Sequence, residues 1–450
     1  MIKAVRGTRD LLPPDTARWN FVEEIARDVF RLYNYREIRT PIFEDLSLFQ
    51  RSVGEETDIV SKEMFSWFDE PKWFQEILRL ANLPQEERQR AERQLAPMSD
   101  LLPQALALRP EATAGIVRAY IEHDLNRTGL LQRLYMMGPM FRRERPQKGR
   151  YRQFFQIDAE VIGPPTAGSE SPSVDAELLE MLATFLERIG ITGWTLELNS
   201  VGCANDRPKY NEALRAALAK DLDKMCEDCR RRAVTNPLRV LDCKVPEDQP
   251  IIAKLPRMLD YLDESCRQHF QAVRDLLATV NVPYVVNARL VRGLDYYTRT
   301  AFEFTHGALG AQNAILGGGR YDGLSESLGG PKAPGIGFAI GEDRLVLALS
   351  KTAEELSTPP DAYIAPLGAG MDREAARLAR ELRKRGIVVE LGDESFRLKK
   401  SLETASKIGA RYAVIVGENE VKANAFALKN LATGAQVTVP RAELADKIRQ

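Results

Sequence analysis

The sequence contains little histidine and little cysteine for its length. Its 450 residues include only three histidines and five cysteines. The histidines, His123, His269 and His306, lie far apart along the chain. This spacing gives poor support for a histidine-rich metal site or for a Ser-His triad, in which a base must sit beside its nucleophile. We therefore look to other residue types for chemistry.

The cysteines form an odd set, which in a chain of this size argues against a disulfide framework. Cys226 and Cys229 make a C-x2-C pair, Cys203 precedes them, and Cys243 and Cys266 follow at uneven intervals. A zinc site would need a second tight pair of ligands, which the second half of this group lacks. We expect free thiols and no bound metal, with structural zinc as the less favoured alternative.

Long apolar runs and an excess of either charge are also missing. No apolar run approaches the ~20 residues that a membrane-spanning helix requires, and the first ten residues hold no apolar signal core. The net charge is −1, so contact with RNA has to come from local patches rather than from a bulk field. We expect a cytoplasmic protein that does not associate with membranes.

What the chain does contain is enough material for two or three domains. Hydrophobic residues make up 44% and charged residues 28%, which is typical of a globular protein. A polar stretch at 351–360, ending in two prolines, is the best domain boundary, and strands alternate with helices beyond it. Residues 359–450 carry 16 Lys/Arg and 12 Asp/Glu, a net charge of +4. A basic module on a body of net charge −5 fits an appendage that contacts RNA.

The stretch 139–163 predicts two strands joined by a long polar loop. The loop and its flanks carry five arginines and a lysine but one acid, Glu144. Arginine forks suit phosphate oxygens because their donors are planar and permanently charged. On the returning strand Gln156, Asp158 and Glu160 share one face, since side chains alternate along a strand. This pattern fits a nucleotide beside a small polar substrate, or equally a solvated basic hairpin.

Other short motifs could also face a ligand. Glu111 and Thr113 stand at a strand-to-helix junction, where they could bind an ammonium group or where Thr113 could simply cap the helix. Residues 315–323 contain three consecutive glycines, where a backbone can approach a ligand closely or a sheet can bend tightly. Residues 334–347 predict a strand that turns into a helix, with Arg344 near the helix start.

The remaining segments suggest how these motifs are supported. Arg36–Asp45 predicts a strand that carries Pro41, and proline lacks the donor of a central ladder, so this strand belongs at a sheet edge or a dimer seam. Residues 67–106 and 203–266 are rich in charge and helix formers, and we expect both to be helical insertions.

Taken together, these motifs resemble the histidyl-tRNA synthetase family, a class II aminoacyl-tRNA synthetase family. The general signatures are Arg-Gly-Thr-Arg-Asp at 6–10, Thr-Pro at 40–41, Phe-Arg-Arg-Glu-Arg at 141–145 and Gly-Glu-Asp-Arg at 341–344. More diagnostic are Leu-Val-Arg-Gly-Leu-Asp-Tyr-Tyr at 290–297 and Gly-Gly-Gly-Arg-Tyr-Asp at 317–322. One departure is Ala112, where the family often has glycine.

The resemblance implies an architecture and an activity. The expected fold is an α+β catalytic domain over 1–350, with an antiparallel sheet flanked by helices and the two helical insertions, then a linker at 351–360 and an α/β anticodon-binding domain at 361–450. The expected reaction activates L-histidine with ATP and Mg²⁺ to histidyl-adenylate, releases pyrophosphate, and transfers histidine to the 3′ end of tRNA(His) with release of AMP. The expected assembly is a homodimer.

The resemblance also implies roles for thirteen residues. Arg142, Arg292 and Arg344 would be catalytic: Arg142 on the α-phosphate, Arg344 on the γ-phosphate, and Arg292 near the reacting carboxylate. The ATP-binding residues would be Arg142, Glu144 at the adenine edge, Arg150, Phe154 stacked on the ring, and Arg344. The histidine-binding residues would be Glu111, Thr113 and Gln156 at the ammonium group, Glu160 and Tyr297 at the imidazole, and Arg142, Arg292, Tyr296 and Tyr321 around them.

Two other classes of protein compete with this interpretation. A catalytically silent synthetase-like regulatory subunit could sense histidine, but such proteins usually lack the C-terminal module and parts of the ATP motifs. This chain keeps the 361–450 module together with Arg142, Arg292 and Arg344. A tRNA-binding module without chemistry would leave the pocket residues unexplained. The enzyme is therefore the favoured hypothesis.

Overall fold

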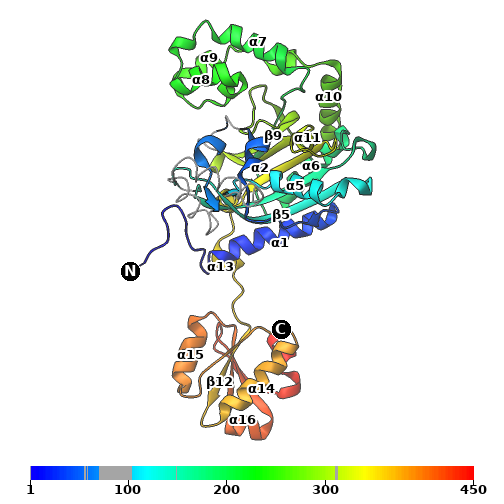
Figure 1. Cartoon of the computed structure of the whole chain (residues 1–450). Helices are drawn as coiled ribbons and strands as arrows, with labels where there is room; N and C mark the ends of the chain where they lie inside the picture. The colour runs from blue at the N-terminus through cyan, green and yellow to red at the C-terminus, as the bar shows by residue number, and fades with distance from the viewer. Residues whose placement is uncertain (1, 55–56, 58, 70–103, 148, 310–312) are drawn as a thin grey trace, which may run out of the picture. The chain divides into compact units, whose positions relative to one another are not determined.

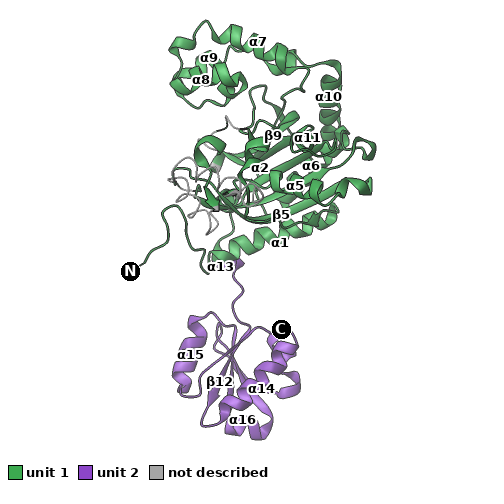
Figure 2. Ribbon diagram, viewed as in Figure 1, with its two compact units in different colours: residues 1–353 green, residues 354–450 purple. Residues whose placement is uncertain are grey.

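The computed structural model describes residues 2–54, 57, 59–69, 104–147, 149–309 and 313–450. These residues form two compact units, Met1–Ala353 and Glu354–Gln450, which are described separately (Figure 2). The first unit holds the predicted sheet, its helices and the 203–266 segment (Figure 1).

An eight-stranded sheet forms the centre of the first unit. Its strand order is β1-β5-β6-β11-β10-β9-β7-β8, and neighbours are antiparallel except at the two edges, where β1 pairs with β5 and β8 with β7 in parallel. The strands in this order are Arg36–Glu37, Gln132–Phe141, Gln153–Ile162, Gly335–Gly341, Ala314–Arg320, Thr298–His306, Trp194–Ser200 and Val285–Val286. The predicted hairpin of 139–163 is confirmed as β5, its loop and β6.

The main hydrophobic core lies against one face of this sheet. Helices α1 (Thr16–Leu32), α6 (Pro172–Arg188) and α10 (Glu264–Thr279) contribute their apolar faces to it. Phe30 of α1 stacks on Tyr135 of β5 with 4.4 Å between ring centroids. On β6 the apolar residues point into this core while Gln156, Asp158 and Glu160 alternate with them. The opposite face is therefore left for polar chemistry.

The predicted strand over Arg36–Asp45 is in fact two short strands. Arg36–Glu37 forms β1 at the edge of the large sheet, and β2 (Phe43–Asp45) belongs to a small sheet of order β2-β4-β3. Pro41 lies between them, and the guanidinium of Arg109 binds the carbonyl oxygens of Thr40 and Pro41 at 3.0 and 3.3 Å. The proline breaks the ladder, so a single strand was wrong, while the expected edge position is correct.

The two ends of the first insertion do not form the expected helices. Its ends are strands, β3 (Ser66–Asp69) and β4 (Gln104–Leu108), which pair with each other. The helical prediction was wrong for these ends, because β4 pairs with β3 on one side and with β2 on the other. Residues 70–103 lie outside the described part of the chain.

The 203–266 segment is helical, as its composition indicates. It contains α7 (Arg207–Leu218), α8 (Glu227–Thr235), the short 3₁₀ helices η6 (Pro237–Asp242) and η7 (Pro246–Asp248), and α9 (Gln249–Ile252). In Figure 1 these elements gather together, apart from the large sheet. They close around two small clusters of their own rather than around the main core.

The second unit is a five-stranded α/β sandwich with its own core. The strand order is β13-β12-β14-β15-β16, parallel at β13-β12-β14 and antiparallel beyond. Its strands are β12 (Ala362–Leu367), β13 (Val389–Leu391), β14 (Tyr412–Gly417), β15 (Ala425–Asn430) and β16 (Gln436–Pro440). Its helices are α14 (Met371–Lys384), α15 (Leu398–Lys407), α16 (Glu418–Ala423) and α17 (Leu444–Arg449).

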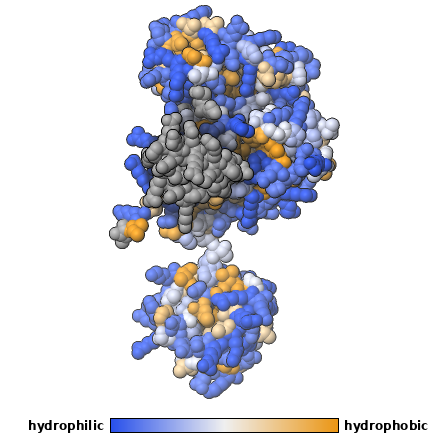
Figure 3. Space-filling view, in the orientation of Figure 1, coloured by the Kyte–Doolittle hydropathy of each residue, from blue (hydrophilic) through white to orange (hydrophobic). Residues whose placement is uncertain are grey.

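The surface agrees with the hydropathy of the sequence. Hydrophilic residues cover most of the face drawn in Figure 3, and the hydrophobic ones form small separate areas. Within the described ranges, none of the helices combines the length and the apolar character needed to cross a bilayer.

Candidate active site

A cavity of about 300 Å³ opens on the polar face of the large sheet. Its floor comes from β6, β10 and β11, and its walls come from the β5–β6 loop, the start of α5 (Thr113–Glu122) and the loop around Arg292. Eleven of the thirteen predicted residues line it: Glu111, Thr113, Arg142, Glu144, Arg150, Phe154, Gln156, Arg292, Tyr296, Tyr297 and Arg344. The other two, Glu160 and Tyr321, lie directly behind its wall.

The hairpin loop supplies one cationic wall. The Nε of Arg142 donates to the carbonyl oxygen of Pro110 at 2.9 Å, and its guanidinium lies 5.3 Å from the centroid of the Phe154 ring. Glu144 accepts from Arg150 at 3.0 Å and lies 3.8 Å from Arg142. A single carboxylate thus stands between two guanidinium groups, and the loop keeps a net positive charge for an anion.

The first turn of α12 (Glu342–Ala348) completes this wall. Burial lowers the pKa of the Arg344 guanidinium, and the charge of Arg150 nearby lowers it further. Two close like charges favour an anionic ligand between them. The neighbouring Asp343 has a structural role, because its carboxylate accepts the backbone N–H of Phe155 at 3.0 Å and pairs with Arg9 at 2.5 Å.

Arg292 also lines the cavity and accounts for part of the triple-glycine motif. Its guanidinium pairs with Glu303 of β9 at 2.5 Å. A Cβ on Gly317 would lie only 2.7 Å from that guanidinium, so glycine is needed for Arg292 to lie across β10. A Cβ on Gly318 would lie 2.0 Å from the carbonyl oxygen of Gly337 on the next strand. The glycines therefore serve both the site and close strand packing.

The floor of the cavity carries unpaired polar atoms. Gln156 Oε1 and Asp158 Oδ2 are buried, and neither has a hydrogen-bond partner among the described residues. Burial raises the pKa of Asp158 well above its ordinary value, and the nearby carboxylates of Glu160 and Glu111 raise it further. Buried polar atoms are almost always paired in folded proteins, so these two indicate a polar ligand.

Glu111, rather than Thr113, caps the helix. Its carboxylate oxygens accept the backbone N–H groups of Thr113 and Ala114 at 2.8 and 2.9 Å. The predicted cap by Thr113 was wrong, because the Thr113 hydroxyl is bound to Glu160. Ala112 occupies the N-cap with φ −99°, a conformation open to any residue, so the departure from glycine leaves the site intact.

Glu160 holds a hydroxyl network behind the cavity wall. The Thr113 and Tyr321 hydroxyls each lie 2.6 Å from its carboxylate, and the Cβ-free Gly337 provides the space for it. Burial raises the pKa of Glu160 to about 8. Thr113 itself lines the cavity, so the network reaches the cavity surface, and Tyr296 packs edge-on against Tyr321 with 5.9 Å between centroids.

Sequence reasoning missed two residues of the cavity and assigned no role to a third residue of a diagnostic motif. Glu303 and Asp343 line the cavity and fix Arg292 and the hairpin loop. The alternation of side chains along β9 could have indicated that Glu303 faces the cavity, and the Gly-Glu-Asp-Arg motif contains Asp343. Arg320, inside the diagnostic Gly-Gly-Gly-Arg-Tyr-Asp signature, is fully buried and pairs with Asp175 away from the cavity.

Comparison with known proteins agrees with this geometry. Residues 79–345 match the family model for histidyl-tRNA synthetase, and residues 361–450 match the model for an anticodon binding domain. The chain is 66% identical over 451 residues to the histidine–tRNA ligase of Koribacter versatilis (strain Ellin345), covering 100% of this chain and 96% of that relative. It is 54% identical over 449 residues to the histidine–tRNA ligase of Solibacter usitatus (strain Ellin6076), covering 100% and 99%.

A solved structure extends the likeness to the fold. The apo histidyl-tRNA synthetase of S. aureus superposes with a TM-score of 0.77 at 33% identity and covers 100% of both chains. The predicted architecture, an α+β body followed by an α/β anticodon-binding domain, is thereby confirmed. On the evidence of its motifs, its cavity, its two domain matches and these relatives, the chain belongs to the histidyl-tRNA synthetase family.

Proposed function

We propose that this chain is a histidine–tRNA ligase and that the cavity on the large sheet is where it activates L-histidine with ATP. The observation that carries the proposal is the arrangement of Arg142, Arg292 and Arg344 around one cavity whose floor holds the unpaired Gln156 and Asp158. The histidyl-adenylate formed there then passes its histidyl group to the 3′ end of tRNA(His), with release of AMP.

ATP occupies the side of the cavity formed by the hairpin loop and α12. Arg142 contacts the α-phosphate, and Arg344 and Arg150 receive the outer phosphates. The adenine ring stacks on Phe154, and Glu144 accepts a hydrogen bond at its edge. The position of Arg142 over the Phe154 ring supports this assignment, because it brings a phosphate donor and a stacking surface side by side. Mg²⁺ would accompany ATP and neutralise part of its phosphate charge, with few ligands from the protein.

Activation is the attack of the histidine carboxylate on the α-phosphorus of ATP, with pyrophosphate as the leaving group. Both reactants are anions, so fixed cationic donors are what the transition state needs. Arg142 and Arg292, which both line the cavity, provide them. The nucleophile is already ionised, so the step requires no side-chain base, and the scarcity of histidine in the chain is no obstacle.

Histidine occupies the polar floor. Gln156, Glu111 and Thr113 surround its ammonium group, and Tyr296 and Tyr297 flank its imidazole. Glu160 does not line the cavity, so an imidazole N–H reaches it only by replacing the Thr113 or Tyr321 hydroxyl on its carboxylate. An amino acid without ring nitrogens would leave these buried partners unpaired, which is the basis for rejecting it.

The test is amino-acid-dependent ATP–pyrophosphate exchange across all twenty amino acids, without tRNA. The proposal requires exchange with histidine alone. Exchange with another amino acid would refute the assigned specificity. Exchange with none, in a protein that still binds histidine, would favour a regulatory subunit that senses histidine.

Two assembly features complete the proposal. The chain works as a homodimer, and the support is an exposed apolar group beside Pro41, formed by Ile42, Phe43, Trp67 and Phe68. Residues 359–450, which carry a net charge of +4, contact tRNA(His), in keeping with the match of residues 361–450 to an anticodon binding domain.

A further inference from the structure

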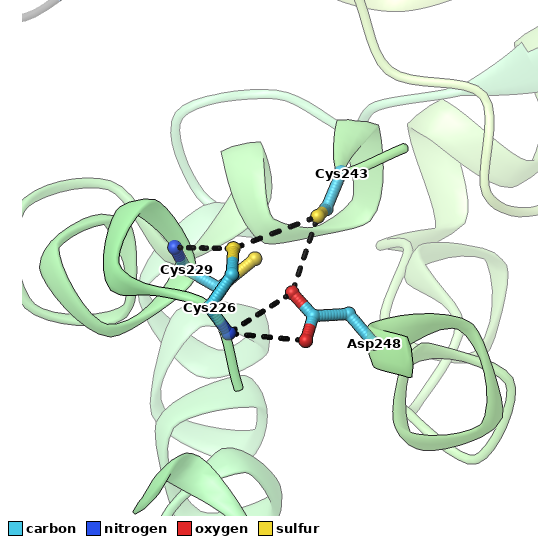
Figure 4. Close-up of side chains that lie close together, drawn as sticks. All are labelled: Cys226, Cys229, Cys243 and Asp248. Atoms are coloured by element: carbon cyan, nitrogen blue, oxygen red, sulfur yellow. Dashed lines mark hydrogen bonds between the residues drawn. The ribbon is translucent and has the colours of Figure 1, made fainter. Parts of the chain in front are cut away.

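The helical insertion brings together four side chains that can bind a metal ion. Cys226 and Cys229 begin α8, Cys243 follows η6, and Asp248 ends η7. Figure 4 shows the three thiols and the carboxylate converging on one point. Their donor atoms all lie within 4.8 Å of one another. The uneven spacing in the sequence hid this arrangement, and the fourth ligand is an aspartate rather than a cysteine.

The distances fit a tetrahedral site. With zinc–sulfur bonds of about 2.3 Å, two sulfurs of a tetrahedral site lie about 3.8 Å apart. The sulfurs of Cys226 and Cys243 are 3.9 Å apart, and Asp248 Oδ2 is 3.2 Å from the sulfur of Cys243. We propose that Cys226, Cys229, Cys243 and Asp248 bind one Zn²⁺ ion in a closed structural site.

The surroundings suit charged ligands. The backbone N–H groups of Cys229 and Val245 donate to the sulfurs of Cys226 and Cys243, each at 3.4 Å. The N–H of Cys226 donates to Asp248 at 3.1 Å. Such donors orient ligands and stabilise their negative charge. Cys229, Cys243 and Asp248 are buried, as expected for a structural site, and a thiolate-rich set selects zinc over Mg²⁺ or Ca²⁺.

The helical insertion also needs a cross-link between its elements. Around the cluster its elements are short, and its apolar groups are small and separate from the main core. Small structural units of this kind commonly depend on a metal or a disulfide. All five cysteines are free thiols, so a metal is the cross-link that this cluster can provide.

A second cluster in the same insertion offers a matched control. It consists of Cys203, Asp206, Asp263 and Cys266. It has only two thiols beside its two carboxylates, so it lacks the thiolate-rich ligand set of the first cluster. We assign zinc to the three-thiol cluster alone.

The proposed site also bears on the cavity, and this part rests on the proposed function. Asn236 and Arg239 lie between the second and third zinc ligands in the chain, and both bind Asp295, at 3.0 and 3.2 Å. Asp295 stands in the loop between Arg292 and Tyr296. A bound metal would therefore fix the segment that holds this loop in place.

The first experiment measures metal in the full-length protein after expression in zinc-supplemented medium and gel filtration, by inductively coupled plasma mass spectrometry. We expect about one zinc per chain. Cys243→Ser and Asp248→Asn should each lower zinc affinity at least about tenfold, whereas the double variant Cys203→Ser/Cys266→Ser should keep its zinc. A wild-type zinc content near zero, or loss of zinc in the double variant alone, would overturn the proposal.

Wild-type protein gives a second readout that does not depend on whether a variant folds. Replacement of zinc by Co²⁺ should produce thiolate-to-cobalt charge-transfer absorption and the visible bands of a tetrahedral ion. Their absence overturns the site. Zinc-loaded protein without histidine-dependent exchange would contradict the proposed function and leave the metal site standing. Unchanged exchange after zinc removal would refute only the link to the Arg292 loop.

Discussion

At the scale of single residues, the cations of the cavity are held in place before any ligand binds. Arg142 is tied to the Pro110 carbonyl, and Arg292 is held between Glu303 and the bare backbone of Gly317. Preorganised donors stabilise developing charge without a cost of reorganisation during the reaction. Removing one of them should therefore affect the chemical step more than the binding of substrate.

Arg292→Ala should reduce histidine-dependent ATP–pyrophosphate exchange by about 10²- to 10³-fold, the usual effect of deleting one such donor. Histidine affinity, measured by isothermal titration calorimetry, should change little, because the floor residues are untouched. Arg289→Ala is the matched control, since this arginine belongs to the same loop but does not line the cavity. Normal exchange by the Arg292 variant would refute its role.

Glu342 predicts a pH dependence of stability. Burial raises its pKa to about 9, and Glu23 and Asp343 add to the effect. At pH values between the ordinary pKa of a glutamate and about 9, Glu342 carries a proton in the folded protein but has lost it in the unfolded chain. The contribution to stability is therefore complete below about pH 4.5 and is lost as the pH rises, with a limit of about 1.4 kcal/mol per pH unit.

In Glu342→Gln this loss should disappear. Urea unfolding at pH 5.5 and 8.5 should show a smaller decrease in the free energy of unfolding for the variant than for the wild type. The exposed Glu212→Gln is the control and should follow the wild type. Equal decreases in wild type and Glu342→Gln would contradict the prediction.

Which residues share the site could be predicted from motifs, but how each is used could not. Eleven predicted residues line the cavity because short motifs fix them at strand ends and loops. Glu160 and Tyr321 form a buried network, and Arg320 forms a buried ion pair with Asp175. How deeply a side chain is buried depends on residues that are distant in the sequence, so no local sequence pattern predicts it.

At the scale of elements, strand β10 shows that two adjacent glycines, Gly317 and Gly318, can be required for different reasons. A Cβ on Gly317 meets the movable end of a side chain, whereas a Cβ on Gly318 meets backbone of β11. Gly317→Ala should keep the fold and lower exchange at least about tenfold by displacing Arg292. Gly318→Ala should lower the free energy of unfolding by about 1–3 kcal/mol.

Urea unfolding and the exchange assay, applied to both variants, separate the two effects. If Gly317→Ala and Gly318→Ala lower the free energy of unfolding equally, the position of Arg292 is not the reason why residue 317 is a glycine.

Most helices and the long strands could be predicted from periodicity, because their buried faces are long enough to leave a pattern. The exceptions are short. Pro41 divides one predicted strand between two sheets, and strands β3 and β4 occupy the ends of a segment whose charge suggested helix. In these pieces, pairing with distant strands outweighs local propensity.

At the scale of the whole molecule, the exposed group beside Pro41 predicts an interface. Light scattering at micromolar concentration should give twice the chain mass of 50.6 kDa. Phe43→Asp should shift the protein toward monomer, because a charge would be buried at the interface, whereas Val437→Asp in the second unit should not. A wild-type monomer would refute the dimer.

The anchoring of the N-terminal segment has a consequence for synthesis on the ribosome. Gly7 accepts the N–H of Arg152, and Arg9 lies over Tyr151 and pairs with Asp343. Arg9 is thus held by a residue that is made 334 positions after it. Because Tyr151 packs against Arg9, the hairpin loop cannot acquire this support until the ribosome has reached Asp343, long after the loop itself has been made.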